Sequence, residues 1–424
     1  SDACEVNIMS ICLVSLIGKG NLSKNREVED VKGGYKKTTY VFPDRKIDSC
    51  VFTEALLEYY KSSLKNVVII GTDESFWNAL LPDPYDNDCI LWDEIEKERS
   101  NNSISQHLLV KLESRLSEYY KCQFKLLCHA KDISKCEDSI TATYSKIISN
   151  LNKSTKTVFD ITSGYRYMPM LAFQELQLHD SFLGLDNVIM LYGEYDCELS
   201  YVRDITGVWK REIINKEIHT FKTTLNGKML SKILSKYGEK EISDWIEELT
   251  EYIQKDYLLL CDDVFFRRLK NILKKKKDQI TKETFVNEII AFLYDLCSKF
   301  DFNQRRISSY LFVFSKILYE TGNHTQAIIA LRESVRARLS ENHNLEDLYE
   351  FIKAEDLKRK DYYHDFEMKC SLKGVLSQIN ELNNLRNSIA HAGADQKKEI
   401  RKTFKYSFED YYKAAEIVLK EIEQ

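Results

Sequence analysis

Apolar residues follow two different patterns along the chain. In the first half they gather in short continuous runs, which are typical of strands buried on both faces of a mostly parallel sheet. Such runs predict strands at residues 6–16, 67–70, 123–128, 157–161, 187–192 and 198–202. Residues 38–42 and 45–49 flank a Pro-Asp pair and predict a hairpin. The intervening segments predict helices at residues 52–60 and around 104–120, a short helix carrying Ser75 and Trp77, and one with Pro169 in its first turn.

In the second half, apolar residues recur at helical spacing to the end of the chain. The pattern predicts helices at residues 217–237, 241–260, 264–276, 282–300, 306–320, 324–341, 374–391 and 407–421. The alternation of strands and helices in the first half predicts a doubly wound α/β domain over residues 1–206. Residues 207–280 are expected to form a helical linking segment, and residues 281–424 a helical bundle.

Composition and charge change at the same place. All four prolines precede residue 208, as do nine of the 14 glycines. Residues 1–206 carry 23 Lys and Arg against 31 Asp and Glu, whereas residues 207–424 carry 38 against 35. With 43% hydrophobic and 30% charged residues, the chain can build real cores under polar surfaces. No apolar run approaches the length of a membrane span, so we expect no membrane contact.

The 11 cysteines are scattered without a CxxC pair, which favours reduced thiols and a cytoplasmic location. Cys122, Cys128, His129 and Cys136 come nearest to a metal cluster. Their spacing lacks the paired ligands of a structural zinc site. No metal is therefore expected, and small buried apolar side chains are the better interpretation of most thiols.

Three of the predicted strands end in turns rich in small polar residues. These turns hold Gly18, Lys19, Gly20 and Asn21; Gly71 and Thr72, ahead of Ser75 and Trp77; and Thr162, Ser163, Gly164, Tyr165 and Arg166. Doubly wound sheets bind ligands at the carboxyl ends of their strands, where backbone N–H groups, hydroxyls and helix N-termini hold phosphates. Each turn alone could equally be a plain tight turn, but three turns facing one crevice favour a nucleotide-like anion. Neither GxGxxG nor GxxxxGKS/T occurs, which disfavours an ordinary dinucleotide or triphosphate.

Candidate chemistry in the second half lies in residues 380–394, NELNNLRNSIAHAGA. Apolar residues recur there at helical spacing, and Gly393 is placed to end the helix. His391 would lie in the last turn, where unpaired carbonyls favour an imidazolium. Arg386 and Asn387 precede it by about one turn. A guanidinium that grips a phosphate, beside an imidazole that moves a proton, is sufficient for cutting RNA without metal.

The spacing of Arg386 and His391 requires a further element of structure. Five residues on a straight helix give about 7.5 Å of rise and roughly 140° of rotation, so the two side chains would not share a face. Either the helix ends between them, or a second copy of the chain completes the site at a two-fold axis. The same spacing recurs at Arg338 and His343 and at Arg359 and His364, but among polar residues in loop-like sequence.

Three other features of the second half are candidates for contact with RNA. The basic run at residues 274–277 is more often a solvated helix end. Arg332, Arg336 and Arg338 follow an apolar face and could line a basic cleft or form a surface stripe. Residues 361–364 hold two tyrosines that could stack on bases or pack within a loop.

Taken in order, these motifs resemble those of the CARF–HEPN ribonucleases that accompany type III CRISPR systems. The branch known for a D-x-T-H-G motif has its counterpart in Asp160, Ile161, Thr162, Ser163 and Gly164. Its G-x-G-N turn resembles residues 18–21, and its Gly-Thr turn with a nearby Ser and Trp resembles residues 71–77. The R-x4-6-H signature of HEPN domains matches Arg386 and His391, with Asn387 after the arginine, and residues 322–339 resemble the preceding helix.

The resemblance implies a Rossmann-like CARF sensor domain over residues 1–206 and an all-α HEPN ribonuclease domain over residues 281–424. It implies a homodimer, or a higher oligomer, that cleaves single-stranded RNA without metal once cyclic oligoadenylate lies across the CARF crevices. Cyclic tetra-adenylate is the expected activator, although the residues do not distinguish ring sizes; no other cofactor and no stable protein partner are implied. The expected ligand contacts are Gly18, Lys19, Gly20, Asn21, Gly71, Thr72, Ser75, Trp77, Asp160, Thr162, Ser163, Gly164, Tyr165 and Arg166.

The resemblance also assigns catalytic roles. RNA would be cut by attack of its own 2′-hydroxyl, which leaves a cyclic phosphate. His391 would transfer a proton, Arg386 would stabilise the phosphate charge, and Asn387 would position the pair. One residue departs from the family pattern: Ser163 stands where the D-x-T-H-G branch has His. Whether the sensor degrades its own ligand therefore stays open.

Two other functions remain as alternatives. The first is a ligand-gated, non-catalytic interaction protein with the same sensor domain; the Arg386 and His391 pair argues against it, because a binding protein needs neither. The second is a HEPN ribonuclease of the toxin–antitoxin type without nucleotide control, and the strand-end crevice argues against that.

Overall fold

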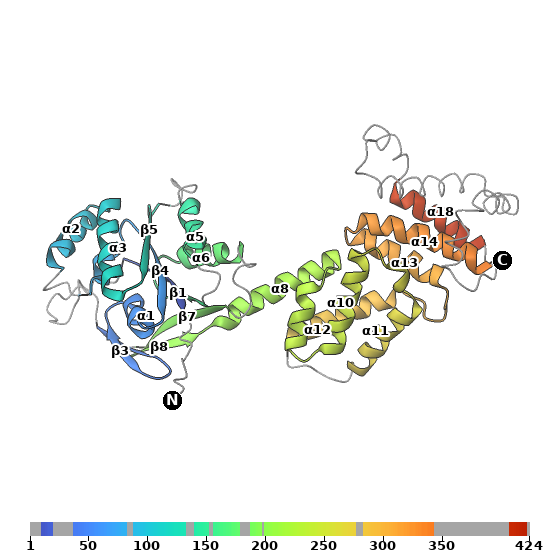
Figure 1. Ribbon diagram of the computed structural model, residues 1–424, viewed down its shortest axis with the longest axis horizontal. Helices are drawn as coiled ribbons and strands as arrows, with labels where there is room; N and C mark the ends of the chain where they lie inside the picture. The colour runs from blue at the N-terminus through green and yellow to red at the C-terminus, as the bar shows by residue number, and fades with distance from the viewer. Residues whose placement is uncertain are drawn as a thin grey trace, which may run out of the picture. The chain divides into compact units, whose positions relative to one another are not determined.

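The chain divides into two compact units, residues 1–213 and residues 214–424, and the boundary falls within helix α8 (Thr206–Thr224) (Figure 1). The computed structural model describes residues 10–19, 37–82, 88–132, 140–151, 156–178, 187–196, 199–276, 283–342 and 407–421. An α/β sheet domain followed by a helical region confirms the predicted fold class. The predicted boundaries at residues 206 and 280 stay a prediction.

The described part of the first unit is built on one eight-stranded sheet in the order β3-β2-β8-β7-β6-β1-β4-β5. Its strands are β1 (Ile11–Leu16), β2 (Thr38–Val41), β3 (Lys46–Ser49), β4 (Leu64–Thr72), β5 (Gln123–His129), β6 (Lys156–Asp160), β7 (Val188–Asp196) and β8 (Leu199–Asp204). The predicted hairpin is the antiparallel pair β2–β3, in which Thr38 pairs with Ser49. The first strand begins at Ile11 rather than at residue 6; Ser10 is not in a strand, and residues 6–9 lie outside the described residues.

Five adjacent strands, β7, β6, β1, β4 and β5, run parallel, and β8 returns antiparallel to β7. Strand β1 lies at the centre, with Val14 in register with Val68 of β4 and with Phe159 of β6. After the β2–β3 hairpin at one edge of the sheet, the chain adds β4 and β5 on one side of β1, and later β6 on the other side. Such a reversal is the switch point at which doubly wound sheets bind ligands.

Two cores flank the sheet because successive side chains of β1 point to opposite faces. Leu13 belongs to one core, with residues of α1 (Phe52–Tyr60), α2 (Cys89–Ser100) and α3 (Gln106–Tyr120). Val14 belongs to the other, with residues of α5 (Lys146–Ser149), α6 (Tyr167–Leu178) and α8. Figure 1 shows these two groups of helices on opposite sides of the sheet.

Sequence patterns failed to predict α2 and α5. In α2 only Ile95 is buried, so the helix lacks the apolar stripe that reveals a helix in a sequence. Helix α5 spans four residues, too few to show a period. The short helix expected around Ser75 and Trp77 is the 3-10 helix η1 (Trp77–Leu80), and Ser75 lies in the turn before it.

The second unit is helical throughout its described part. Beyond α8 it contains α9 (Lys228–Lys236), α10 (Lys240–Gln254), the 3-10 turn η2 (Leu258–Leu260), α11 (Asp263–Lys276), α12 (Thr284–Ser298), α13 (Ile307–Glu320), α14 (His324–Asn342) and α18 (Phe408–Glu421). The helix predicted at residues 374–391 lies outside the described residues. Among the described helices, none is both long enough and apolar enough to cross a membrane.

The single helix predicted at residues 217–237 is wrong, because the chain breaks between α8 and α9. Leu225 adopts a left-handed φ of 56°, and the Gly227 N–H donates to the Thr250 hydroxyl at 2.9 Å. A Cβ on Gly227 would lie 2.1 Å from Cγ2 of Ile246. Leu225 and Leu230 on either side are both buried, so the apolar pattern continues across the break and conceals it.

The helix predicted at residues 241–260 also extends too far. Helix α10 ends at Gln254, and Asp256 takes a left-handed φ of 57° before η2 begins. No glycine marks this end in the sequence. In the hairpin of α13 and α14, by contrast, Gly322 provides the left-handed turn residue (φ 74°). Helix α18 packs against that hairpin through ring stacks of Tyr412 on Phe312 and Phe408 on Tyr319.

Candidate functional site

The turns that follow β6, β1 and β4 meet at one edge of the first unit. These three strands are neighbours in the sheet, so their carboxyl ends lie side by side. A Cβ on Gly18, after β1, would lie 2.9 Å from the backbone nitrogen of Gly164, after β6. On the other side, the Phe76 N–H donates to the Gly18 carbonyl at 3.0 Å. The turn after β1 therefore contacts both of its neighbours, and the three predicted turns lie together at the edge of the sheet where the crevice is expected.

The turn after β4 is held by its own polar side chains. The Ser75 hydroxyl donates to the Ile17 carbonyl at 2.8 Å and accepts from the Thr72 N–H at 2.7 Å. The Trp77 indole N–H donates to the Thr72 carbonyl at 2.9 Å. Thr72, Ser75 and Trp77 are all 0% exposed. These buried side chains therefore stabilise the turn itself. Gly71 has no room for a side chain, since a Cβ there would lie 2.6 Å from the Trp77 ring.

The turn after β6 is organised by the buried carboxylate of Asp160. Its two oxygens accept from the Ser15 hydroxyl at 2.6 Å and from the Thr162 N–H at 2.7 Å. Burial raises the pKa of Asp160 to about 6, against the lowering effect of these hydrogen bonds. The Thr162 hydroxyl accepts from the Gly193 N–H at 2.7 Å. Asp160 thus holds the turn from inside the core, whereas Ser163 is half-buried and Gly164 and Arg166 are exposed.

A carboxylate that the sequence analysis did not select joins four strand ends. Glu74, in the turn after β4, accepts from Lys19 at 3.2 Å, from Lys131 at 3.0 Å and from the Tyr165 hydroxyl at 3.0 Å. These partners follow β1, β5 and β6, respectively. Burial raises the pKa of Glu74, but the hydrogen bonds from Lys131, Lys19 and Tyr165 outweigh it and leave the pKa below its ordinary value. Glu74 is therefore ionised at neutral pH.

Aromatic rings border this charged group. The Tyr165 and Tyr167 rings are nearly parallel, with centroids 5.9 Å apart, and the Lys131 ammonium lies 5.9 Å from the Tyr165 centroid. His129, at the end of β5, is buried and bonds through Nδ1 to the Ala130 carbonyl at 2.8 Å. Burial lowers its pKa, so the ring is neutral at physiological pH. Ammonium groups beside aromatic faces suit a ligand with phosphates and flat bases.

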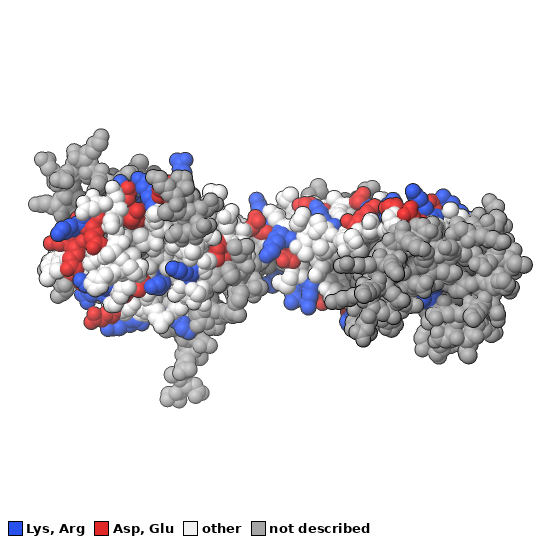
Figure 2. Space-filling view, turned by 90° about the horizontal axis from the view of Figure 1, so that it is seen from above, with Lys and Arg blue, Asp and Glu red and all other residues white. Residues whose placement is uncertain are grey.

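Sequence reasoning missed Glu74 and Lys131 because single polar residues carry no periodic signal. The available signal was position, because Glu74 and Lys131 each lie within four residues of the end of a predicted strand, as do Gly18 and Thr162. Charges of both signs are interspersed on the visible described surface of each unit (Figure 2). The visible described surface therefore shows no broad basic field.

Several candidate residues lie outside the described residues: Gly20, Asn21, Cys136, Arg386, Asn387 and His391, together with the aromatic segment 361–364. Of the possible zinc cluster, Cys122 and Cys128 are free thiols whose pKa values burial raises, to about 11 and about 12. Within the described ranges, no three His, Cys, Asp or Glu side chains are grouped so as to hold a metal ion.

The arginines of α14 do not form a surface stripe, because all three are buried. Glu333 accepts from Arg332 at 2.8 Å and from Arg336 at 2.9 Å. Arg338 is 1% exposed and donates to the Leu419 carbonyl of α18 at 3.0 Å. These arginines pair within the helical unit, whereas the basic run at Lys274–Lys276 ends α11.

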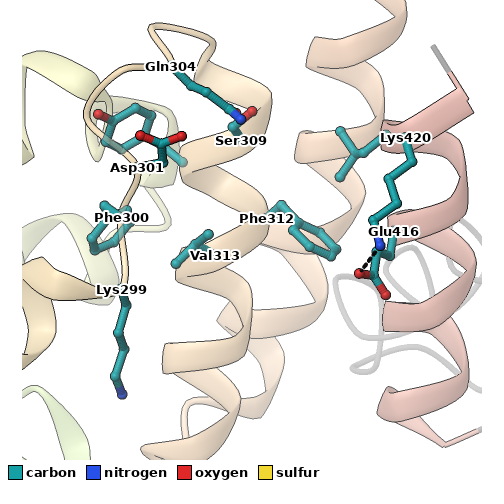
Figure 3. Close-up of a pocket in the computed structure, with 11 residues that line it drawn as sticks. Lys299, Phe300, Asp301, Gln304, Ser309, Phe312, Val313, Glu416 and Lys420 are labelled. Atoms are coloured by element: carbon teal, nitrogen blue, oxygen red, sulfur yellow. Dashed lines mark hydrogen bonds and ion pairs between the residues drawn. The ribbon is translucent and has the colours of Figure 1, made fainter. Parts of the chain in front are cut away.

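The helical unit also has an open cavity of about 260 Å³ between the end of α12, α13 and α18 (Figure 3). Phe300, Phe312 and Val313 give it an apolar lining, and the Glu416–Lys420 pair, at 2.7 Å, lies at its α18 side. The cavity combines apolar walls with charges of both signs and does not select one class of ligand.

Residues 12–202, which cover the sheet of the first unit, match the family model described as the CARF domain of the CRISPR system endoribonuclease Csx1. A search of curated proteins found no match to the chain. The family match covers all three strand-end turns and supports the prediction of a CARF domain in the first half of the chain. The D-x-T-H-G branch and the HEPN domain stay predictions.

Proposed function

We propose that the chain is a cyclic-oligoadenylate-activated, metal-independent endoribonuclease that cuts single-stranded RNA in type III CRISPR antiviral defence. The observation that carries the proposal is the CARF match over residues 12–202, together with the contacts that join its three strand-end turns at one edge of the sheet. These turns suit the chemistry of an adenylate ring, because Lys19, Lys131 and Arg166 follow β1, β5 and β6, and the rings of Tyr165 and Tyr167 lie beside them. Cyclic tetra-adenylate is the first ring to test.

The proposed reaction needs only the groups that the sequence offers at residues 386–391. The 2′-hydroxyl of one nucleotide attacks the adjacent phosphorus, the bond to the 5′-oxygen of the next nucleotide breaks, and a 2′,3′-cyclic phosphate and a 5′-hydroxyl result. His391 transfers the proton, Arg386 stabilises the charge that develops on the phosphoryl oxygens, and Asn387 positions both. The geometric mismatch of Arg386 and His391 on one helix supports a homodimer, in which a second copy completes the site.

The two parts of the proposal are tested separately. Binding of cyclic tri-, tetra- and hexa-adenylate to the full chain is measured first, by calorimetry. Cleavage of a fluorogenic single-stranded RNA is then followed in the presence of a metal chelator, with and without the ring that binds. A ring that binds and raises the cleavage rate supports both parts. Binding without cleavage would instead favour a ligand-gated, non-catalytic protein, and no binding by any ring would remove the sensor function.

A further inference from the structure

Glu74 offers one oxygen to three donors that come from three different strand ends. Its Oε2 accepts from Lys19 Nζ at 3.2 Å, from Lys131 Nζ at 3.0 Å and from the Tyr165 hydroxyl at 3.0 Å. Its Oε1 also accepts from Lys131, at 3.1 Å. Two ammonium groups and a phenol around one anionic oxygen are the partners that a phosphate oxygen would take.

Exposure differs sharply within this group. The Glu74 side chain is 10% exposed, whereas those of Lys19 and Lys131 are 48% and 49% exposed. The carboxylate thus lies under the two lysines, and the lysines reach solvent from the crevice edge. A ligand arriving from solvent meets the ammonium groups before it meets Glu74.

The negative charge of Glu74 affects how strongly the two lysines attract a ligand anion. At neutral pH, Glu74 cancels one of the two positive charges that it gathers, so it weakens their attraction for a second anion. A phosphate bound to the same lysines would lie within several ångströms of the carboxylate. At that distance the repulsion between two unit charges is large enough to change an affinity severalfold, even where water screens it.

We propose that Glu74 is an internal counterion that stands in for a ligand phosphate, and that Lys19 and Lys131 bind that phosphate by exchanging one anion for the other. This inference rests on the proposed sensor function and adds Glu74 and Lys131 to its site. It predicts the direction of the effect: the Glu74 carboxylate lowers the affinity for the ligand.

The exchange also links ligand binding to the start of α6. Tyr165 directly precedes the helix, which begins at Tyr167, and its hydroxyl is bonded to Glu74. When a phosphate takes the lysines, Glu74 keeps Tyr165 as its remaining partner among these three. Because the Lys131 ammonium also lies 5.9 Å from the Tyr165 ring centroid, its move to a phosphate would change the contacts of the turn that leads into the helix.

The test uses the full chain with cyclic tetra-adenylate as the probe. Glu74→Gln keeps the size of the side chain and removes its charge, so we expect affinity to rise about three- to tenfold at low ionic strength. The gain should shrink as salt is added, because the lysines are half-exposed. Glu94→Gln is the matched control, since Glu94 pairs with Lys111 between α2 and α3 at 3.0 Å, and its affinity should equal that of the wild type.

Lys131→Met provides the second measurement. It should weaken binding at least severalfold, and it decides the matter if Glu74→Gln does not fold. Unchanged or weaker binding by a folded Glu74→Gln protein would overturn the inference, as would unchanged binding by Lys131→Met. Failure of the wild type to bind any cyclic oligoadenylate would remove the proposed sensor function as well, so the two failures are distinguishable.

Discussion

The Ser15 hydroxyl donates a hydrogen bond of 2.6 Å to the Asp160 carboxylate, and this bond joins the central strand β1 to the end of β6. Both residues are 0% exposed. The Thr53 hydroxyl lies 2.8 Å from that of Ser15, so the group extends to α1. The floor of the crevice is therefore a polar group enclosed in the core, and its charge state should influence the stability of the sheet domain.

The first prediction concerns the pH dependence of stability. Burial raises the pKa of Asp160 from 3.8 to about 6, so the folded state keeps its proton at pH values where the unfolded state has lost it. The contribution of Asp160 to stability is thus fully present below its unfolded pKa and is lost as pH rises toward about 6. The loss should be on the order of 3 kcal/mol.

Asp160→Asn isolates this effect, because the amide oxygen can still accept from the Thr162 N–H. Urea denaturation of both proteins across that pH range should show a steeper fall for the wild type. Parallel curves for the two proteins would mean that Asp160 does not titrate in this range.

The second prediction concerns the contact between the turns after β1 and β6. In Gly18→Ala the new methyl group would lie 2.9 Å from Gly164 N and 3.2 Å from its Cα, both backbone atoms that cannot rotate away. We expect a loss of about 1–3 kcal/mol in the free energy of unfolding, together with weaker ligand binding.

Gly207→Ala serves as the control for that variant, because a Cβ there meets nothing within 4 Å and the residue lies in α8. It should be neutral or stabilising, by up to about 1 kcal/mol. Equal melting temperatures for the two variants would show that the turns separate without cost.

The third prediction concerns catalysis. His391→Ala and Arg386→Ala should each abolish RNA cleavage and leave binding of cyclic tetra-adenylate unchanged, because the proposed sensor and nuclease sites lie in different parts of the chain. His343→Ala is the matched control, since Arg338 and His343 have the same spacing in the sequence. Cleavage by His391→Ala at the wild-type rate would refute the catalytic assignment.

The fourth prediction compares a buried cation with an exposed one. Arg338→Met removes a donor to the Leu419 carbonyl at a side chain that is 1% exposed, and should destabilise the helical unit by about 1–3 kcal/mol. Lys420→Met removes a cation that is 72% exposed and pairs with Glu416 one turn earlier in the same helix. It should lower the free energy of unfolding by less than about 0.5 kcal/mol. Thermal unfolding monitored by circular dichroism separates the two; similar melting temperatures would contradict the role assigned to Arg338.

The parts of the fold that follow from local pattern were predictable. In β1, six successive residues are buried, and they form a nearly continuous apolar run in the sequence. Helix α1 spans Phe52–Tyr60 as predicted, because its buried face shows as a helical apolar pattern. The break after Thr224 and the end of α10 were not predictable from local pattern, because contacts with distant residues cause them. Ile246 and Thr250 hold Gly227 in place from another helix, and no local pattern announces that contact.

Some residues of the candidate site could also be predicted from local sequence, and others could not. Small residues in strand-end turns pointed to Gly18 and Gly164, whose close approach the structure shows. Their chemical partners were harder to find, since Lys131 and Glu74 are 57 residues apart and meet only because β5 adds beside β4. The predicted ligand contacts also differ in exposure, because Asp160 and Ser75 are enclosed, Ser163 is half-buried and Arg166 is exposed.

The alternation of Leu13 and Val14 between two cores limits how this domain can be redesigned. Because every position of β1 is buried, inserting or deleting a single residue would exchange the two packing surfaces along the whole strand. Gly18, in the turn that follows, is equally restricted, because a Cβ there would meet the backbone of Gly164. A redesign of ligand specificity must therefore leave the strand and Gly18 unchanged and vary side chains that reach solvent from the strand ends, such as Lys19.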